Sequence, residues 1–388
     1  MGLGKFVFMF FPDYHHFGWP EILSLIAFGG FILIVINYIV NVAPVSFFRS
    51  VRLSTADTPV PVSIIICAKN EEENLTEFLP KVLSQDYPEF EVVVVNDCSW
   101  DNTERVVDEF AKIFPNLRKA TIKEDPYYKH GKKFAMLVGI KAATHNHLLF
   151  TDADCYPSSD QWLREMATGF TTEKELVLGY GAYERKTGFL NRLIRYDAFM
   201  IGVQFLSAAI RKKPYMGVGR NLAYTRSLFF REKGFSTHYH INSGDDDLFV
   251  NQVANGDNTN ICLSEKAITY SIAKTSFREW GIQKARHFTT GPLYNSVSKS
   301  RLAFNYFSQY FFYLSLIPLA FSMRTVLLIP ALFLLKIIVQ LVSLGKSTKK
   351  LNERDLLVVS WIYELILLFI YPIFHVTKFF YKQNRWTN

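Results

Sequence analysis

The sequence predicts an α/β domain with a mainly parallel sheet, flanked by apolar segments long enough to cross a membrane as helices. Two observations support this prediction. Between residues 60 and 290, short apolar runs alternate with helical patterns, as they do in consecutive βαβ units. Towards the two ends of the chain, residues 22–43 and 302–376 concentrate apolar side chains with few charges between them. We therefore expect a central domain between two membrane regions.

The N-terminal membrane region is a single predicted helix. Residues 22–43 carry no charge and are long enough to span a bilayer. A cleavable signal peptide fits poorly, because the apolar run is too long, starts late and lacks a basic segment before it. We predict a retained anchor after an N-terminal segment, residues 1–21. Arg49 and Arg52 follow the anchor, so the positive-inside rule predicts a cytoplasmic central domain.

The C-terminal membrane region contains three apolar segments, which predict two or three helices before a basic tail. They comprise residues 302–322, 325–344 and 356–376, and the tail comprises residues 377–388. The basic loop 346–354 agrees with a cytoplasmic central domain. The tail agrees only if the last segment lies at the membrane interface instead of crossing, and both alternatives stay open. Lys336, inside the second segment, either extends to the membrane surface or faces a cavity.

Composition excludes several classes of protein. The net charge is +8, but many basic residues lie beside the apolar segments, where phospholipid head groups and an anionic substrate explain them better than nucleic acid does. The four cysteines are far apart and form no CxxC pair, which excludes a zinc ribbon and offers no disulfide framework. This pattern is consistent with a reducing cytoplasm.

Polar residues follow three predicted strands of the central domain, at residues 62–67, 91–95 and 147–151. Ligands bind beyond the carboxyl ends of the strands in open parallel sheets. The candidate ligand-binding residues at these ends are Ala68, Asn70 and Glu72 after the first strand, Asp97 after the second, and Asp152 and Asp154 after the third. Three strands that end in this way predict one binding crevice.

Asp152 and Asp154 are one residue apart, so strand alternation is expected to direct both carboxylates to the same side. They suit a divalent cation, although an acidic turn at the end of a strand would show the same residues. Asp97 is either a turn residue or a nucleoside ligand. Because the sequence has no GxGxxG and no P-loop, diphosphate binding depends on metal and basic groups. Lys132 either supplies such a group at a helix start or is an ordinary solvated lysine.

Together these residues resemble the family-2 glycosyltransferases of the GT-A (nucleotide-diphospho-sugar transferase) fold, especially membrane-anchored bacterial members. The opening strand 62–71 and the turn 94–103 are similar to the nucleoside-contacting parts of that family. The resemblance implies that Ala68, Glu72 and Asp97 contact uridine or guanosine, with Lys132 nearby. It also implies that Asp152-Ala-Asp154 is a DxD motif, whose carboxylates hold the sugar nucleotide through Mg²⁺ or Mn²⁺.

The segment from Ser243 to Phe249 resembles the acidic motif that supplies the catalytic base of the family. Direct inverting transfer needs a carboxylate that takes the proton of the acceptor hydroxyl. We predict Asp246 as this base, with Asp245 and Asp247 beside it, because crowding of like charges raises a carboxyl pKa. The alternative is an N-cap cluster for a helix over residues 248–254, and one structure could show both roles.

Two further segments resemble acceptor-side motifs. The segment from Gln283 through Arg286 to His287 is similar to QxxRW, with histidine in place of tryptophan, and implies that Arg286 approaches the leaving diphosphate. This departure weakens the analogy with processive synthases, and a basic stretch at the membrane surface is the alternative. The glycine-rich segment 217–223 resembles the loop before the acceptor site and makes Arg220 and Asn221 candidates.

The sequence therefore predicts a metal-dependent, inverting hexosyltransferase that uses a UDP- or GDP-linked sugar. The predicted acceptor is membrane-associated, either lipid-linked or a cell-envelope polysaccharide, and the location is the cytoplasmic face of a bacterial inner membrane. The alternatives are a processive polysaccharide synthase and a catalytically silent, nucleotide-binding membrane protein. A transporter is disfavoured because the predicted spans lack paired charges of the kind that line ion pathways.

Overall fold

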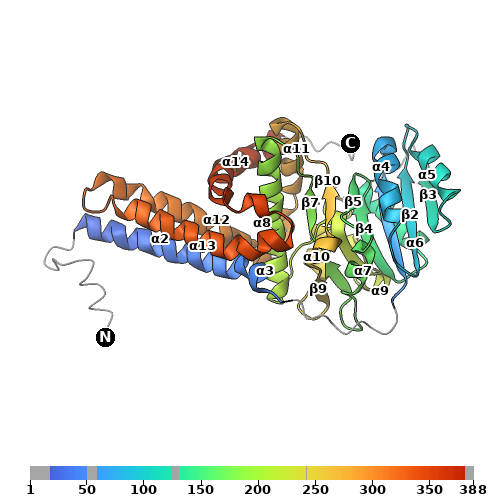
Figure 1. Cartoon of the computed structure of the whole chain (residues 1–388), viewed down its shortest axis with the longest axis horizontal. Helices are drawn as coiled ribbons and strands as arrows, with labels where there is room; N and C mark the ends of the chain where they lie inside the picture. Colours follow the sequence, from blue (N-terminus) through green and yellow to red (C-terminus); the bar gives the residue numbers. More distant parts are fainter. Residues whose placement is uncertain (1–17, 50–58, 125–130, 242, 381–388) are drawn as a thin grey trace.

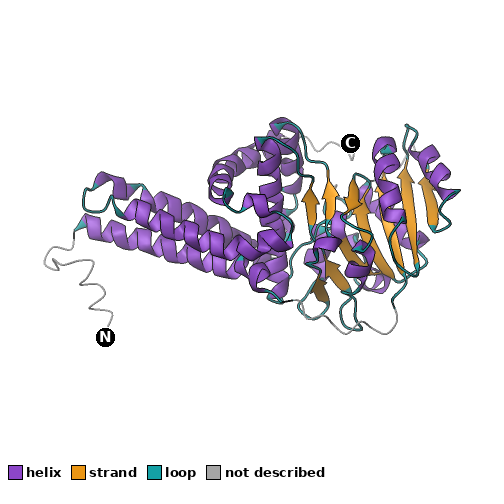
Figure 2. Cartoon of the chain, in the orientation of Figure 1, coloured by secondary structure: helices purple, strands orange, loops and turns teal. Residues whose placement is uncertain are grey.

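The protein has an α/β domain at one end and a projection of long helices at the other (Figure 1). The computed structural model describes residues 18–49, 59–124, 131–241 and 243–380. Strands occur only in the domain, whereas the projection is entirely helical (Figure 2). The division expected from the distribution of apolar residues is therefore visible in the arrangement of the elements.

The described part of the chain contains ten strands. They are β1 (Val62–Ala68), β2 (Phe90–Asp97), β3 (Leu117–Ile122), β4 (His147–Asp152), β5 (Cys155–Pro157), β6 (Leu176–Leu178), β7 (Gly181–Tyr183), β8 (Leu222–Thr225), β9 (Thr259–Ile261) and β10 (Thr269–Ser271). The α-helices are α2 (Trp19–Asn41), α3 (Ala43–Phe47), α4 (Glu72–Leu83), α5 (Thr103–Ala111), α6 (Lys132–Ala142), α7 (Trp162–Ala167), α8 (Phe189–Ile210), α9 (Arg226–Arg231), α10 (Asp247–Val253), α11 (Phe277–His287), α12 (Ser296–Leu316), α13 (Leu328–Lys350) and α14 (Ser360–Phe380).

The main sheet has the strand order β3-β2-β1-β4-β8-β6-β9. The first four strands in this order are parallel, and β8 is antiparallel to both of its neighbours. The prediction of a mainly parallel sheet is thus confirmed. Cys67 of β1 pairs with Asp152 of β4, and Ala68 pairs with Asn96 of β2. The carboxyl ends of these three strands are therefore level, which brings their following loops to one edge.

Alternating side chains of the central strands divide the core into two layers. Ile65 of β1 packs in the same cluster as Ala135 and Met136 of α6, whereas Ile64 packs in the cluster that contains Leu75 of α4. Helices therefore cover both faces of the sheet, as expected for βαβ units. Every residue of β1 is buried, which explains why the strand consists almost entirely of apolar residues.

A second, three-stranded sheet has the order β5-β10-β7. Its strands have three residues each and escaped the sequence analysis, since such short runs carry no measurable alternation. The two sheets are joined at β4 and β5, which are separated by only a two-residue turn. This turn contains Asp154, so the junction of the sheets shapes the crevice.

Three helices, α2, α12 and α13, pack along one another to form the projection (Figure 1). Among the described residues, four helices are long and apolar enough to cross a membrane: α2, α8, α13 and the 360–377 part of α14. One of them, α8, lies inside the predicted central domain of residues 60–290. However, 72% of the apolar stretch of α8 is buried within the protein, against 33% for α2 and 28% for α13. Burial identifies α8 as a core helix.

The last helix, α14, does not extend the projection but lies against α11 and α8 (Figure 1). By length and composition it could cross a membrane. Its position beside the domain favours the interfacial alternative instead. The basic residues of the tail beyond α14 lie outside the described residues.

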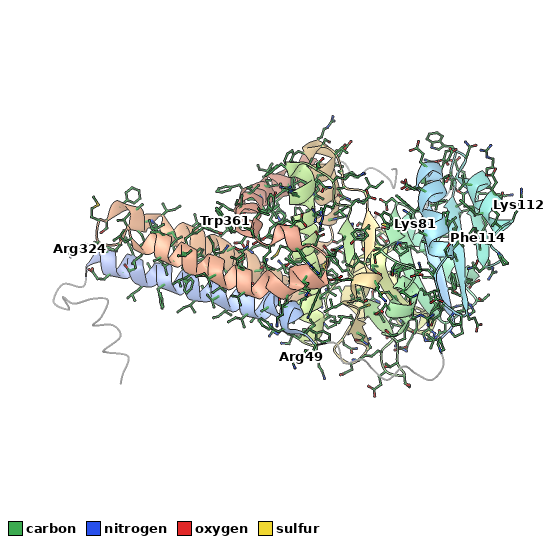
Figure 3. The ribbon with its side chains drawn as sticks, in the orientation of Figure 1. Arg49, Lys81, Lys112, Phe114, Arg324 and Trp361 are labelled. Carbon is green, nitrogen blue, oxygen red and sulfur yellow. The ribbon has the colours of Figure 1, made fainter. Side chains whose placement is uncertain are left out.

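Lys336 on α13 lies fully inside the protein, with its ammonium group 2.6 Å from the carboxylate of Glu364 on α14. It therefore does not extend to the membrane surface. The expectation that the apolar segments lack paired charges was wrong, because this ion pair joins two of them. The projection also has charges at its two ends: Arg49 is at the domain end and Arg324 at the opposite end (Figure 3).

Candidate active site

Asp152 ends β4, and Asp154 lies in the turn that follows. Strand alternation was therefore the wrong reason to place the two carboxylates together. The turn nevertheless brings ligand atoms of Asp152, Asp154 and Cys155 within 4.8 Å of one another. Ala153 between them is buried in the core beneath the turn. The two carboxylates thus share one small region at the edge of the sheet.

Lys132, the first residue of α6, connects this turn to a second acidic segment. Its Nζ atom is 2.7 Å from Oδ1 of Asp152 and 3.1 Å from Oδ2 of Asp245. Burial opposes the charge of Lys132, but the carboxylates of Asp152, Asp245 and Asp246 outweigh it and raise the lysine pKa well above its usual value. One ammonium group therefore shows that the two acidic segments lie side by side.

Asp245, Asp246 and Asp247 are buried to different degrees and have different partners. Asp246 caps α10: its Oδ1 accepts a hydrogen bond from the Asp247 amide, and its Oδ2 accepts one from the Gly219 amide, both at 2.7 Å. Burial, together with the charges of Asp245 and Asp247, raises the pKa of Asp246 to about 7. Capping and a raised pKa coexist in this carboxyl group, so the structural and chemical roles do not exclude each other.

Asp245 and Asp247 flank Asp246 in opposite electrostatic situations. The Lys132 charge and hydrogen bond lower the pKa of Asp245 despite its burial. Burial raises the pKa of Asp247, although its Oδ2 accepts hydrogen bonds from the Thr290 and Tyr294 hydroxyls. We call Asp152, Asp154, Asp245, Asp246 and Asp247 the carboxylate cluster.

Hydrogen bonds join the loop after β1 to the loop after β2. Asn70, at φ 58°, accepts a hydrogen bond from the Trp100 amide, and its own amide donates to Ser99. Glu72 accepts hydrogen bonds from the backbone and side chain of Asn102. The side chains of Asn70 and Glu72 therefore hold the rim of the crevice.

Ala68 and Asp97 lie deeper, at the ends of their strands. Both are fully buried, and Lys69 Nζ is 3.9 Å from Oδ2 of Asp97. The position of Asp97 on β2, level with the end of β1, is compatible with both of its predicted roles. The two ends together place a small residue and a carboxylate at the floor of the crevice.

The glycine-rich segment 217–223 contains Arg220 and Asn221, which lie in a short turn of 3₁₀ helix before β8. Arg220 donates a hydrogen bond to the Gly181 carbonyl and stacks on Tyr183, and its charge acts on Asp154. The side-chain oxygen of Asn221 accepts a hydrogen bond from the indole nitrogen of Trp162. Its side-chain nitrogen donates hydrogen bonds to the carbonyls of Tyr180 and Ala267. Arg220 thus contributes charge beside the DxD turn, while Asn221 fixes the backbone that carries it.

Helix α11 presents the predicted QxxR residues Gln283, Arg286 and His287. Arg286 and His287 are exposed, whereas Lys284 on another face of the helix is buried. The chain just after α11 reaches the carboxylate cluster, because the Thr290 and Tyr294 hydroxyls donate hydrogen bonds to Asp247.

Four residues near the cluster escaped the sequence analysis: Glu71, Lys133, Thr290 and Tyr294. Burial and the charges of Asp154 and Asp152 raise the pKa of Glu71 to about 7, which indicates that it faces the DxD turn. Lys133 donates to the carbonyls of His238 and Ile241, just before the acidic segment. The polar residues of the run Asn70–Asn74 were a signal for Glu71. Contacts with Thr290 and Tyr294 are long-range and left no pattern in the sequence.

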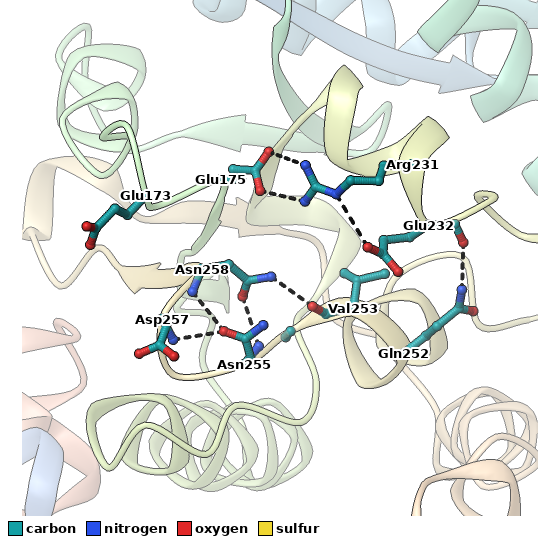
Figure 4. Close-up of a pocket in the computed structure, with 10 residues that line it drawn as sticks. Glu173, Glu175, Arg231, Glu232, Gln252, Val253, Asn255, Asp257 and Asn258 are labelled. Carbon is teal, nitrogen blue, oxygen red and sulfur yellow. Dashed lines mark hydrogen bonds and ion pairs between the residues drawn. The ribbon is translucent and has the colours of Figure 1, made fainter.

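One open pocket of about 790 Å³ lies elsewhere, between α9 and the loop after α10, and contains no residue of the carboxylate cluster. Figure 4 shows that Arg231 pairs with both oxygens of Glu175, and that the Asn255 side chain accepts hydrogen bonds from the backbone amides of Asp257 and Asn258 in its own loop. Several polar groups of this pocket therefore bind one another.

The residues of the DxD turn fit a hard divalent cation. Asp154 and Asp152 offer oxygen ligands of the kind that Mg²⁺ and Mn²⁺ prefer. Burial and the charge of Asp152 raise the pKa of Asp154, which means that the ionised pair is unfavourable by itself and that a dication between the two carboxylates would stabilise it. The Cys155 thiol, whose pKa is raised by burial and by Asp154, stays protonated and donates to Asp154.

A mainly parallel sheet with acidic strand ends and a DxD turn at the sheet junction defines the GT-A class of nucleotide-diphospho-sugar transferase folds. A solved member has the same fold: the mannosyltransferase PcManGT from Pyrobaculum calidifontis, determined with GDP-Man and Mn²⁺, superimposes with a TM-score of 0.54. The two chains are 18% identical, and the match covers 89% of this chain and 97% of that chain. The expected GT-A fold is therefore confirmed.

Within this class, residues 63–232 match the glycosyl transferase family 2 model. It is 34% identical over 174 residues to Glycosyltransferase AglE of Haloferax volcanii, which is 44% of this chain and 52% of that protein. It is also 34% identical over 99 residues to the poly-beta-1,6-N-acetyl-D-glucosamine synthase of Staphylococcus epidermidis, which is 26% of this chain and 23% of that protein. The chain spans about half of the first relative and a quarter of the second.

Proposed function

We propose that the protein is an inverting, metal-dependent glycosyltransferase that moves a sugar from a UDP- or GDP-linked donor to a membrane-associated acceptor. One observation carries the proposal: Lys132 binds Asp152 of the DxD turn and Asp245 of the acidic segment at the same time. A donor site and a proton acceptor must face one crevice for direct transfer, and this contact supports that arrangement. The family-2 domain and its relatives support the same class of reaction.

In the proposed reaction, the acceptor hydroxyl oxygen bonds to the anomeric carbon as the bond to the diphosphate oxygen breaks. Asp246 takes the hydroxyl proton, and a pKa near 7 suits this role at neutral pH. Asp154 and Asp152 would hold Mg²⁺ or Mn²⁺, which neutralises charge on the diphosphate when bound. Lys132, Arg220 and Arg286 supply fixed positive charge for the departing nucleoside diphosphate.

The donor nucleoside is proposed to lie at the level ends of β1 and β2. Ala68 permits close approach there, and Asp97 offers a buried carboxylate. Asn70 and Glu72 hold the loops that form the rim. Gln283 and His287 stand on the proposed acceptor side with Asp247, and Asn221 supports the wall that carries Arg220.

The helical projection supports a membrane location. Helix α2 is 23 residues long, or about 35 Å, enough to cross the hydrocarbon core. Arg49 and the basic end of α13 lie at the domain end of the projection, which by the positive-inside rule favours a cytoplasmic domain. An acceptor held in the bilayer would reach the site by lateral diffusion.

A processive synthase is less well supported. The histidine at position 287 departs from the tryptophan of the QxxRW motif found in processive synthases. A soluble pool of long polymer made by the purified protein would reverse this preference.

The test uses the full chain in detergent or nanodiscs with Mn²⁺, a membrane lipid extract and a panel of labelled UDP- and GDP-sugars. We expect label from one donor in the lipid or glycan fraction, with the opposite anomeric configuration in the product by NMR. Donor binding without transfer in every acceptor preparation would support the catalytically silent alternative. Retained configuration would contradict the inverting mechanism.

A further inference from the structure

The carboxylate of Glu364 on α14 contacts a side chain from each of the three helices of the projection. Glu364 on α14 pairs with Lys336 of α13 at 2.6 Å and accepts hydrogen bonds from Tyr38 of α2 and, at 3.1 Å, from Tyr313 of α12. Lys336 is 0% exposed and Glu364 is 5% exposed. An ion pair so deeply buried is expensive to form and is weak grounds for stability by itself. Its geometry instead fixes where α14 lies relative to the projection.

A second buried ion pair continues from α14 to the domain. Tyr371, seven residues and about two turns after Glu364, donates a hydrogen bond to Asp197 of α8. The other oxygen of Asp197 is 2.6 Å from Lys284 Nζ of α11. We call Lys336–Glu364 and Lys284–Asp197 the junction pairs.

Apolar contacts reinforce the same interface between α14 and α11. The ring of Phe374 meets Trp280 edge to face at 5.0 Å, and His375 stacks on Phe288 at 4.3 Å. A Cβ atom at Gly281 would lie 3.1 Å from Phe374, so the two helices approach closely at this point. Contacts with α14 and α8 therefore extend along one face of α11, from Trp280 to Lys284.

The segment that follows α11 contacts the carboxylate cluster. The chain after α11 supplies Thr290 and Tyr294, whose hydroxyls bind Oδ2 of Asp247. The backbone amide of Asp247 in turn binds Oδ1 of Asp246. The route from the projection to the proposed base therefore consists of direct contacts between named groups, connected by the stretch of α14 from Glu364 to Tyr371 and by the chain from Lys284 to Thr290.

We propose that Glu364, Tyr371 and Asp197 are positioning residues, which set α11 and the following turn so that Asp246 is held at the acceptor side. In this arrangement, the helices of the projection do more than anchor the domain, because their packing determines the geometry of the base. The inference rests on the proposed function, and the reaction it concerns is the transfer described above. None of these three residues touches the donor loops after β1 and β2 or the DxD turn.

The test uses paired neutral substitutions in the full chain, because removing one member would leave a buried unpaired charge. In the double variant Lys336→Met with Glu364→Gln, we expect kcat to fall about tenfold or more. The donor KM and the thermal shift caused by Mn²⁺ with nucleoside diphosphate should stay within about twofold of wild type. Tyr371→Phe removes only one hydroxyl and should lower kcat in the same direction.

The combination of these variants separates positioning from general loss of stability. Since both act on one chain of contacts, their effects on kcat should be less than additive, whereas independent defects would add. The matched control is Lys350→Met, which removes hydrogen bonds from α13 to the backbone of residues 45–48 but touches neither α14 nor α11. Its kcat per folded molecule should match wild type.

Hydrogen exchange provides a readout that does not depend on catalysis. Amides of residues 284–295 should exchange faster in Tyr371→Phe and in the double variant, and at the wild-type rate in Lys350→Met. If wild type transfers no sugar, the proposed function fails, while the exchange data still test the coupling. Unchanged exchange in this segment, or unchanged kcat in Tyr371→Phe and the double variant, would overturn the inference. A loss of kcat in Lys350→Met as large as in Tyr371→Phe and the double variant would also overturn the inference.

Discussion

The carboxylate cluster and the junction pairs are two groups of charged residues that differ in their balance of negative and positive charge. In the cluster, Lys132 pairs with two of the five carboxylates, Asp152 and Asp245, and the charge of Arg220 acts on Asp154. In the junction pairs, each carboxylate has its own ammonium group at 2.6 Å. Charge that is balanced within the protein holds helices together, whereas charge left in excess is available for a ligand. This difference separates the proposed reaction site from the structural contacts that support it.

The largest expected effect comes from removing the proposed base. Asp246→Asn should lower the rate of sugar transfer about 10³-fold, because general base catalysis contributes factors of this size. Since Asp246 lies among like charges, the variant should be as stable as wild type or more stable in thermal denaturation, unlike a single change in a junction pair. The exposed residue Asp257 provides the control, and Asp257→Asn should keep full activity. A loss of activity below tenfold in Asp246→Asn would remove the base from the mechanism.

Metal binding is the next largest effect, because it relieves the excess charge of the cluster. Mn²⁺ with the cognate nucleoside diphosphate, at about a hundred times its dissociation constant, should stabilise the fold by about 2.7 kcal/mol. Differential scanning fluorimetry should show this as a higher Tm that is lost with a chelator and in Asp154→Asn. Asp86→Asn, at an exposed ion pair with Arg164, should keep the shift. A metal-induced shift of equal size in Asp154→Asn would contradict the assignment of the ligands.

The pH dependence of activity tests the charge excess directly. Because the pKa of Asp246 is raised to about 7, activity should fall as pH drops through about 7 and the base becomes protonated. Asp247→Asn removes one of the like charges that raise this pKa, so the midpoint should move to lower pH. Rates measured from pH 5.5 to 8.5 check both expectations. A midpoint that stays in place in Asp247→Asn would show that Asp247 does not act on the base.

The same raised pKa has a consequence for stability. The folded state binds the Asp246 proton more tightly than the unfolded chain, whose carboxyl group titrates near its ordinary value of 3.8. The contribution to stability is therefore present below about pH 4 and is lost as pH rises towards 7. Above that range the cluster destabilises the empty site, which is the condition under which a bound cation contributes most.

Much of the domain could be predicted because its strands are long and buried. The runs at β1, β2 and β4 and the residues after them were readable from composition and order alone, and so was the DxD turn. The pairing of Lys336 with Glu364 was not readable, since the two residues are far apart in the sequence and each looks like an isolated charge in an apolar segment. The short strands β5 to β7 were missed because tertiary contacts, not local pattern, define them.

The site shows the same limit at the level of single residues. Asp152, Asp154 and Asp246 stand in motifs of closely spaced carboxylates, so their residue types and spacing carried the prediction. Thr290 and Tyr294 reach Asp247 only through the fold of the chain after α11. Hydroxyl residues in a loop carry no sign of such a contact. Local motifs therefore identified the acidic residues that the fold brings together, whereas the contacts that support them needed the structure.

The smallest expected effect concerns the backbone that supports the base. A Cβ atom at Gly219 would lie 3.3 Å from Oδ2 of Asp246, which already accepts the Gly219 amide hydrogen bond. Gly219→Ala should therefore displace the carboxylate slightly and lower kcat about three- to tenfold without changing donor KM. Gly345→Ala is the matched control, because no atom lies within 4 Å of its added Cβ. Equal kcat values for the two variants would show that Asp246 tolerates displacement, and would weaken the inference that precise positioning of the base depends on contacts as distant as the junction pairs.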